Sequence, residues 1–324
     1  MRLIGVELSR YFSRRAVVLL LVAAALFTAL VAGAAVWNTR PVSGDELATA
    51  RAEVQQHLDS QAYQRDLANC ESDPQSFFGP GFDAEDCRRE LTPTPQSYLG
   101  RSTLSLADER GAGGTGVVVV ITLVMVMIGA TFAGADWSSG SMSNQTLFEP
   151  RRGRVWAAKG VAVAAGCAAA ALVVLVGYWL GLLSVADARG IETSGAVQQS
   201  VSWMVGRGVL LAALAGLGGY ALTMLLRSTV ATLAVVFVFV VVGEVVLALS
   251  PVDRSAMWSP SNNVFAWVQD GVRVFDKAVA CAPGQTPCTQ QYAVSLLHGA
   301  GYLAALLIVT LVVSALTFRR RDIT

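Results

Sequence analysis

Charged residues are scarce in this chain of 324 residues: they make up 15% of it, whereas hydrophobic residues make up 54%. A soluble protein carries roughly 25% charged residues. With a mean hydropathy of +0.52, the apolar surplus is too large for one water-facing core, so lipid must surround part of the chain. The net charge of +1 gives no global basic field that would indicate a nucleic-acid partner.

Lysine and histidine are also rare, and their positions exclude several kinds of catalytic site. The two histidines, His57 and His298, lie on different segments, so there is no H-E-x-x-H zinc motif, and no G-x-S-x-G motif occurs. A Walker A loop requires Gly-Lys, but neither Lys159 nor Lys277 follows a glycine. The chain cannot bind ATP through that loop. We expect no enzymatic activity, metal or cofactor in this chain.

Long apolar runs are what the sequence does contain. Six of them reach the length of about 20 residues that a helix needs to cross a bilayer. They comprise residues 16–37, 116–135, 157–183, 203–226, 229–249 and 298–318. Each must be helical, because an isolated strand leaves its backbone hydrogen bonds unsatisfied in hydrocarbon. The predicted fold class is an all-α integral membrane protein with six transmembrane helices.

Charges beside these runs predict the orientation. The segments placed inside, which include residues 1–15, 136–156 and 319–324, carry 12 basic and four acidic residues. The outside segments carry 11 basic and 18 acidic residues over longer loops, namely 38–115, 184–202 and 250–297. The positive-inside rule therefore places both termini in the cytoplasm, and we expect a multi-pass protein of the bacterial plasma membrane.

The first run has a second interpretation. Ser13-Arg14-Arg15, the apolar run and the small residues Ala32-Gly33-Ala34 are also typical of a cleavable export signal. The apolar stretch continues to Trp37, however, and is longer than a usual signal core.

Cysteine positions agree with this topology. Cys70 and Cys87 lie in the first outside loop, and Cys281 and Cys288 lie in the last. Two local disulfides in an oxidising compartment would explain these pairs; four free thiols are the alternative. Metal binding is disfavoured because no histidine lies near either pair. Cys167 falls within the third run, where a small packing residue is expected.

The two large outside loops contain further signals. Ser43 and Glu46 form a capping-box pattern that predicts a helix continuing through Leu67, and a second short helix is expected over residues 84–91. The region 38–115 is therefore predicted to be a mostly helical, disulfide-bearing domain. After Pro260, apolar and polar residues alternate. That segment either dips into the outer leaflet or folds as an ordinary loop.

Two charges and several glycines lie inside the runs. Arg207 and Glu244 are predicted at similar depths, about 6–8 Å below the outer boundary, on consecutive helices. They are expected to form an intramembrane ion pair or to face one polar cavity; separate snorkelling to the headgroups is the alternative. Gly177-x-x-x-Gly181 and Gly216-x-Gly218-Gly219 predict close helix packing.

The segment between the second and third runs is the most informative. It reads DWSSGSMSNQTLFEPRRGRVWAAK from Asp136 to Lys159. Ser139 or Ser141 can cap a short helix, and Pro150 ends it. A basic cluster at the membrane surface follows. A short helix that projects from the bilayer suits docking to a soluble partner.

This segment resembles the cytoplasmic loop of type-2 permease subunits of ATP-binding-cassette (ABC) exporters. In that family an acidic residue precedes a Gly-Thr-Leu-like turn, a short helix, a proline and an arginine. The matching positions and the adjoining arginines are Asp136, Gly140, Ser141, Met142, Leu147, Pro150, Arg151, Arg152 and Arg154. Aspartate replaces the commoner glutamate, and serine replaces the commoner threonine. Residues 1–15 resemble the family's interfacial amphipathic helix.

The resemblance implies a function that depends on other chains. Two permeases, identical or homologous, would form the pathway, and two ABC ATPase subunits would supply ATP and magnesium. The loop would transmit ATPase closure to the spans. The large loop 38–115 is similar to that of longer, actinobacterial or export-type members. A regulatory or sensing component, a proton-coupled secondary carrier and an envelope-assembly protein are the alternatives.

Overall fold

The structure is a computed structural model that describes residues 2–79, 83–250, 252–275 and 291–320. It is mostly helical and has two compact units. One unit comprises residues 1–32 and 106–324, and the other comprises residues 33–105. The first unit is a bundle of long helices and is called the bundle below.

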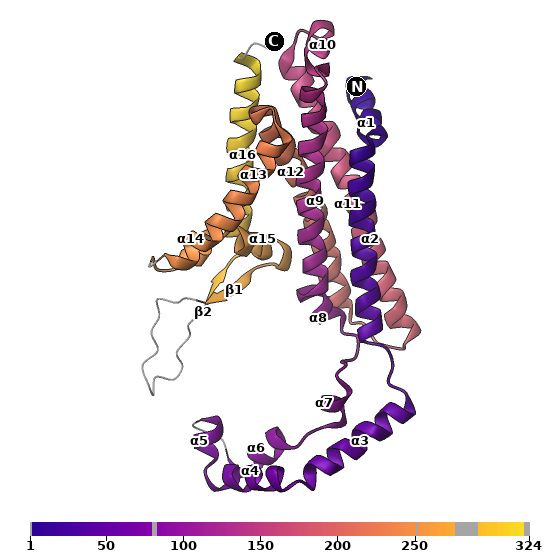
Figure 1. Cartoon of the computed structure of the whole chain (residues 1–324), viewed down its shortest axis with the longest axis vertical. Helices are drawn as coiled ribbons and strands as arrows, with labels where there is room; N and C mark the ends of the chain where they lie inside the picture. Colours follow the sequence, from indigo (N-terminus) through magenta and orange to yellow (C-terminus); the bar gives the residue numbers. More distant parts are fainter. Residues whose placement is uncertain (1, 80–82, 251, 276–290, 321–324) are drawn as a thin grey trace. The chain divides into compact units, whose positions relative to one another are not determined.

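Within the described residues, six helical segments are long and apolar enough to cross a membrane. They are Arg15–Asn38 (α2), Leu106–Ser138 (α8, Leu106–Gly111, with α9, Gly113–Ser138), Arg152–Ala188 (α11), Gly195–Leu226 (α12), Thr229–Leu249 and Leu296–Arg320 (α16). The predicted runs lie inside these segments, which identify a multi-pass membrane protein. The third segment extends beyond the predicted 157–183 at both ends. Figure 1 shows α1 (Arg2–Ser13), α10 (Ser141–Phe148) and the end of α16 at one end of the bundle.

Helices α9, α11 and α12 form the centre of the bundle, because α12 packs along both of the others. Glycine allows this close approach. A side chain on Gly129 or Gly219 would overlap the backbone of the facing helix, and one on Gly216 would overlap Cys167. Close packing is therefore confirmed for Gly216 and Gly219. Gly177 and Gly181 face open space instead.

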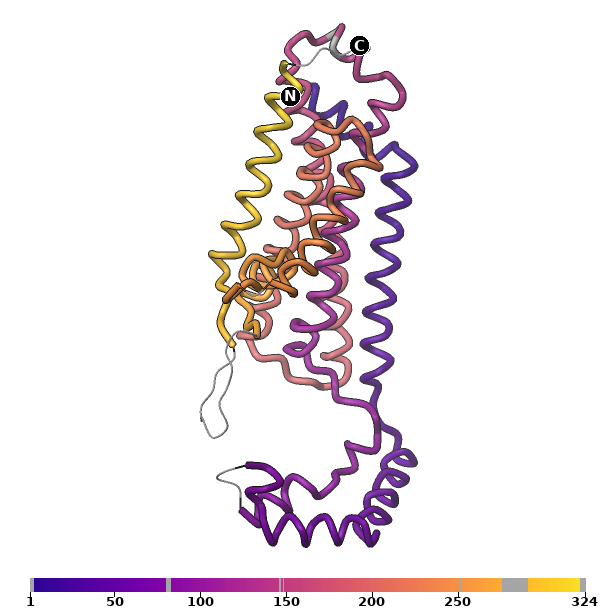
Figure 2. Tube along the Cα trace, turned by 60° about the vertical axis from the view of Figure 1, so that its left-hand side comes forward, coloured from indigo at the N-terminus to yellow at the C-terminus, as the bar shows by residue number. Residues whose placement is uncertain are grey.

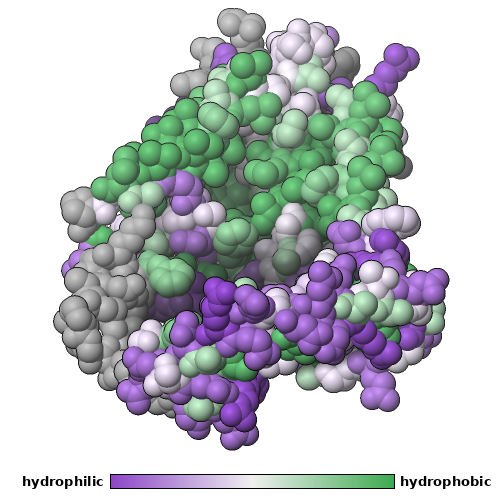
Figure 3. All heavy atoms as spheres, turned by 60° about the horizontal axis from the view of Figure 1, so that its bottom comes forward, coloured by the Kyte–Doolittle hydropathy of each residue, from purple (hydrophilic) through white to green (hydrophobic). Residues whose placement is uncertain are grey.

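The remaining helices lie at the edge of the bundle. Figure 2 shows α2 (indigo) and α16 (yellow) on opposite sides of it. Helix α2 buries only a narrow stripe, which includes Val17, Ala24 and Thr28, and exposes most of its apolar side chains. Figure 3 shows the resulting apolar areas on the surface of the bundle. Lipid is the natural solvent for them.

The fifth segment is interrupted, and the chain after it folds back on the bundle. Helix α13 (Thr229–Phe237) passes through a π-helical turn (Val238–Val242) into α14 (Gly243–Leu249). A 3₁₀ turn (Ser255–Trp258), α15 (Pro260–Gln269) and an antiparallel hairpin of β1 (Val272–Phe275) and β2 (Gln291–Val294) follow, with Val272 opposite Val294.

Helix α15 occupies the segment that begins at Pro260. It packs against α16 and α12, and Asn263, Ala266 and Val268 are buried by protein. This part of the loop is therefore folded onto the bundle.

The second unit contains α3 (Gly44–Leu58), α4 (Gln61–Ser72), α5 (Pro74–Phe78), α6 (Ala84–Leu91) and α7 (Pro95–Leu99). The Ser43–Glu46 capping box is confirmed, and α6 has the predicted bounds. The prediction of one helix through Leu67 is wrong. The first helix ends at Leu58, and the Ser60 side chain accepts a hydrogen bond from the Tyr63 backbone N–H, which starts a new helix.

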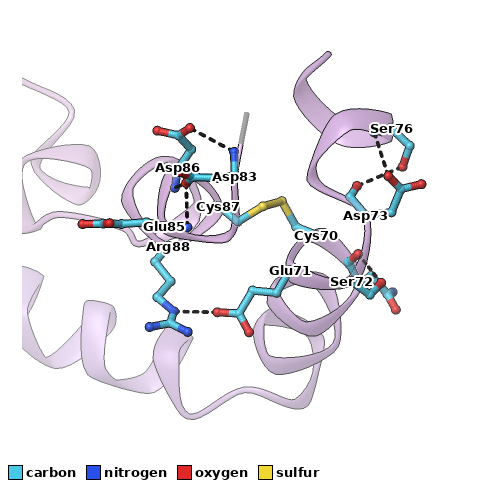
Figure 4. The surroundings of a disulfide bond; sticks show 11 residues. Cys70, Glu71, Ser72, Asp73, Ser76, Asp83, Glu85, Asp86, Cys87 and Arg88 are labelled. Atoms are coloured by element: carbon cyan, nitrogen blue, oxygen red, sulfur yellow. Dashed lines mark hydrogen bonds and ion pairs between the residues drawn. A yellow bond between two sulfur atoms is a disulfide. The ribbon is translucent and has the colours of Figure 1, made fainter. Parts of the chain in front are cut away.

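Two links stabilise the second unit. The Cys70–Cys87 disulfide joins α4 to α6, and the neighbouring Arg88 and Glu71 form an ion pair of 2.6 Å (Figure 4). Glu46 accepts a hydrogen bond from the Ser43 backbone N–H and pairs with Arg101. Both contacts lower the pKa of Glu46, and the hydrogen bond from the Ser43 backbone has the larger effect.

Candidate functional site: a buried ionic network beneath α10

A sharp turn separates α9 from α10. At the end of α9 the Ser139 backbone N–H donates a hydrogen bond to the Ala135 carbonyl. The next residue, Gly140, has a φ of 67°. That left-handed conformation strongly favours glycine. The turn lies at Ser139 and Gly140, and Ser141 and Met142 are the first residues of α10. Ser141 does not cap α10, because its hydroxyl donates to Asp136 at 2.9 Å.

Asp136 is the centre of a buried ionic network. Its carboxylate is 0% exposed in the bundle. The Lys159 ammonium lies 2.5 Å from one carboxylate oxygen, and the Arg14 guanidinium pairs with the other. Arg14 also donates to the Phe132 carbonyl at 2.7 Å and stacks over its ring. Burial of a carboxylate is tolerated where opposite charges and hydrogen bonds surround it in this way.

The same network extends to α1. Lys159, itself 0% exposed, also lies 3.0 Å from Glu7, and Glu7 pairs with Arg10 at 3.2 Å. Helix α1 packs along α11. The network thus joins four elements: α1, the end of α9, the start of α10 through Ser141, and α11. A displacement of α10 would therefore also act on the charged side chains of α1, α9 and α11.

Helix α10 has a buried anchor and an exposed face. Met142 is buried beneath it, whereas Leu147 is 81% exposed. The helix ends at Phe148, and Glu149 is extended, as expected for a residue before Pro150.

The three arginines after Pro150 begin α11. Arg151 occupies its N-cap position, and Arg154 lies 3.5 Å from Glu149. Arg151, Arg152 and Arg154 also line a cavity together with Arg319 of α16.

The structure does not bring Arg207 and Glu244 together. Arg207 pairs with Asp270 at 3.1 Å. Glu244 accepts hydrogen bonds from the Ser259 hydroxyl at 2.8 Å and the Ser261 backbone N–H at 2.7 Å. Both sets of partners lie at the ends of α15: Ser259 is its N-cap residue and Asp270 its C-cap residue. The sequence prediction compared only the depths of the two charges in their own spans and did not include α15. In place of the predicted pair, Glu244 binds the start of α15 and Arg207 binds the residue that follows its end.

The cysteine predictions have separate outcomes. The Cys70–Cys87 disulfide is present. Cys281 and Cys288 lie outside the described residues. Cys167 is free and buried, with its sulfur 3.4 Å from the Tyr11 hydroxyl.

Sequence reasoning missed the functional grouping of Glu7, Arg10, Arg14 and Lys159. Two signals were available. Glu7, Arg10 and Arg14 have helical spacing that places them on one face, and Lys159 is one of only two lysines in the chain. The pattern of each segment alone did not indicate that these residues meet at Asp136.

Among the described residues, no group of three or more His, Cys, Asp or Glu side chains could hold a metal ion. No family model, curated protein or solved structure matches the chain. The fold and the site therefore define the class as a multi-pass membrane protein with a buried ionic network at the end of its bundle that carries α10.

Proposed function

We propose that the chain is the membrane-spanning permease subunit of an ATP-driven, ABC-type exporter. Helix α10 is its contact with a separate ATPase, and the spans form the substrate pathway together with a second permease, identical or homologous. The observation that carries the proposal is the construction of α10: Leu147 is 81% exposed, while Ser141 and Met142 anchor the helix to the bundle.

The network gives the proposed contact a route into the membrane. Force on α10 reaches Asp136 through Ser141, and Lys159 and Glu7 continue the connection to α11 and α1. ATPase closure would thereby move several helices as one. Such a mechanism needs no catalytic residue in this chain, because ATP and magnesium are bound by the partner.

Chain topology supports the orientation with both termini in the cytoplasm. Helix α2 would carry the chain from Arg15 on one membrane face to Asn38 on the other. In this orientation Cys70 and Cys87 belong to an outside loop of the sequence, and the arginines after Pro150 belong to an inside loop. Disulfides are typical of oxidising compartments, and arginine-rich loops are typical of the cytoplasm.

The test is association with an ATPase. The full-length chain is co-expressed with a candidate ATPase that carries a Walker A motif, and any complex is purified in mild detergent. Leu147→Asp should lower the recovered ATPase and its coupled ATP hydrolysis about tenfold or more, since it puts a charge into an apolar contact. Leu297→Asp is the matched control, because Leu297 has a similar exposure of 80% at the other end of the bundle.

Two results would count against the proposal. One is a chain that transports without any bound ATPase, which would favour a secondary carrier. The other is an equal effect of Leu147→Asp and Leu297→Asp on association, with both variants as stable as the unmodified chain.

A further inference from the structure

A second site lies at the same end of the bundle, beside the α10–α11 joint. It is a cavity of about 600 Å³ between the start of α11 and the end of α16. Its lining includes Arg151, Arg152, Arg154, Arg319 and Gly153. The cavity lies beside Leu147 of α10, the residue on which the proposed ATPase contact is tested, but Leu147 does not line it.

The charges of the lining are poorly balanced. Within the described part of the chain, the ion pairs give Arg154 one distant carboxylate, Glu149 at 3.5 Å, and give Arg151 and Arg319 none. The guanidinium groups of Arg151, Arg154 and Arg319 line the same cavity and repel one another, and a bound anion would reduce that repulsion. Arginine is well suited to phosphate, because its planar fork donates two parallel hydrogen bonds.

Backbone geometry adds to this preference. The Arg319 guanidinium lies against Gly153, where an added Cβ would come within 3.0 Å of two of its nitrogens. Glycine therefore lets Arg319 approach the first turn of α11. That helix is 37 residues long, and no side chain caps its N-terminus. The positive end of its dipole points into the same region.

The position of the cavity along the bundle indicates the source of the anion. Two tryptophans contact the same end of α16: Trp156 donates to Ser314 at 3.2 Å, and Trp137 packs edge-on against Phe318. Tryptophans gather at the level of the lipid headgroups. Arg319 follows Phe318 directly, and Arg154 precedes Trp156 by two residues. The cavity therefore opens where phospholipid phosphates lie.

We propose that this cavity binds the phosphate of an anionic phospholipid, such as phosphatidylglycerol, and joins the ends of α11 and α16 through it. Basic pockets between spans on the cytoplasmic side are suited to such headgroups. This inference depends on the six-span architecture and not on the ATPase partner. A free phosphate or an acidic surface of a partner protein are the competing ligands.

The test measures lipid binding to the purified full-length chain. Native mass spectrometry or a fluorescent-lipid titration compares phosphatidylglycerol with phosphatidylcholine. Arg319→Gln should weaken phosphatidylglycerol binding about tenfold, as expected for the loss of one charge-assisted, bidentate contact. Arg320→Gln is the matched control: it removes the same charge from the next, exposed residue and should change binding less than twofold. Arg319→Lys, which keeps the charge and loses the fork, should lie between them.

Several results would overturn the inference. These are equal binding of the two lipids, equal effects of Arg319→Gln and Arg320→Gln, or displacement of phosphatidylglycerol by millimolar inorganic phosphate. Loss of ATPase association in Arg319→Gln with unchanged lipid binding would also do so, since the cavity would then recognise a protein. Failure of the Leu147 experiment leaves the lipid result unaffected, so the two proposals can fail separately.

Discussion

Lys159 places its ammonium where no solvent reaches it, between the carboxylates of Glu7 and Asp136. A charge in such a position is stabilised only if its partners stay in place, because removing one partner leaves the others buried without compensation. Arg14 pairs with Asp136, and Arg10 lies 3.2 Å from Glu7 and 3.6 Å from Asp136, so three positive groups surround the two carboxylates. The arrangement makes the relative positions of α1, α9 and α11 interdependent.

This dependence predicts a double-mutant result. Lys159→Met alone should destabilise the chain by about 3–5 kcal/mol, the usual cost of breaking a buried ion pair. Glu7→Gln together with Lys159→Met should cost less than the sum of the two single changes by about 1–3 kcal/mol, because the Asp136–Arg14 pair remains balanced. Unfolding of each purified variant in detergent measures its change in the free energy of unfolding.

The more exposed pair Arg154–Glu149 is the matched control for this cycle, and its coupling should stay below about 1 kcal/mol. If Glu7 and Lys159 show no more coupling than that pair, the buried network does not hold the helices together.

At the scale of elements, the contact of α9 with α12 depends on the absence of side chains. Gly216 lies against Cys167 and the Met125 carbonyl, and Gly219 lies against the backbone of Val126. An added side chain has no room at either position, so the helices would have to separate along the centre of the bundle.

We therefore expect Gly216→Val to destabilise the bundle by about 1–3 kcal/mol, the range found for overpacking, and to lower the recovery of monodisperse protein. Gly181→Val is the control, because Gly181 lies on a helix of the same bundle and faces open space. Thermal unfolding of the two variants in one detergent compares them. Similar losses of stability in both would show that helix propensity, and not the close contact, is responsible.

The elements themselves were largely predictable, because apolar runs and capping residues are local signals. The six spans follow from length and hydropathy, and the Ser43–Glu46 box marks the start of α3. Partners across the structure were not predictable in the same way. Counting residues gave Arg207 and Glu244 a common depth but could not show that α15 would fold back and bind each of them separately.

Glycine motifs illustrate the same limit. Gly177-x-x-x-Gly181 and Gly216-x-Gly218-Gly219 both have the composition of a packing motif, but only residues of the second face a neighbouring helix closely. The direction of a helix face is set by the whole bundle, which a single segment does not encode. The ionic network is a case of this kind, since Glu7 of α1 meets Lys159 of α11, which lies 152 residues further along the chain.

At the scale of the whole molecule, the bundle has two kinds of surface that differ in what they can contact. Apolar faces of α2, α13, α14 and α16 suit lipid or a second permease, and α10 offers a small exposed contact at the end that carries the arginines. The energy source is expected on another chain, because neither lysine belongs to a Walker A loop. The proposed function therefore depends on whether a protein contacts α10 and on which protein it is.

Site-specific photo-crosslinking measures that identity most directly. A photoreactive phenylalanine replaces Leu147 in one variant and Leu297 in the control, both in otherwise unmodified full-length chains. Irradiation of intact cells followed by mass spectrometry identifies the attached protein. The account predicts that position 147, and not position 297, crosslinks to an ATPase with a Walker A motif. A crosslink from position 147 only to lipid, or to a protein without an ATP-binding domain, would contradict it.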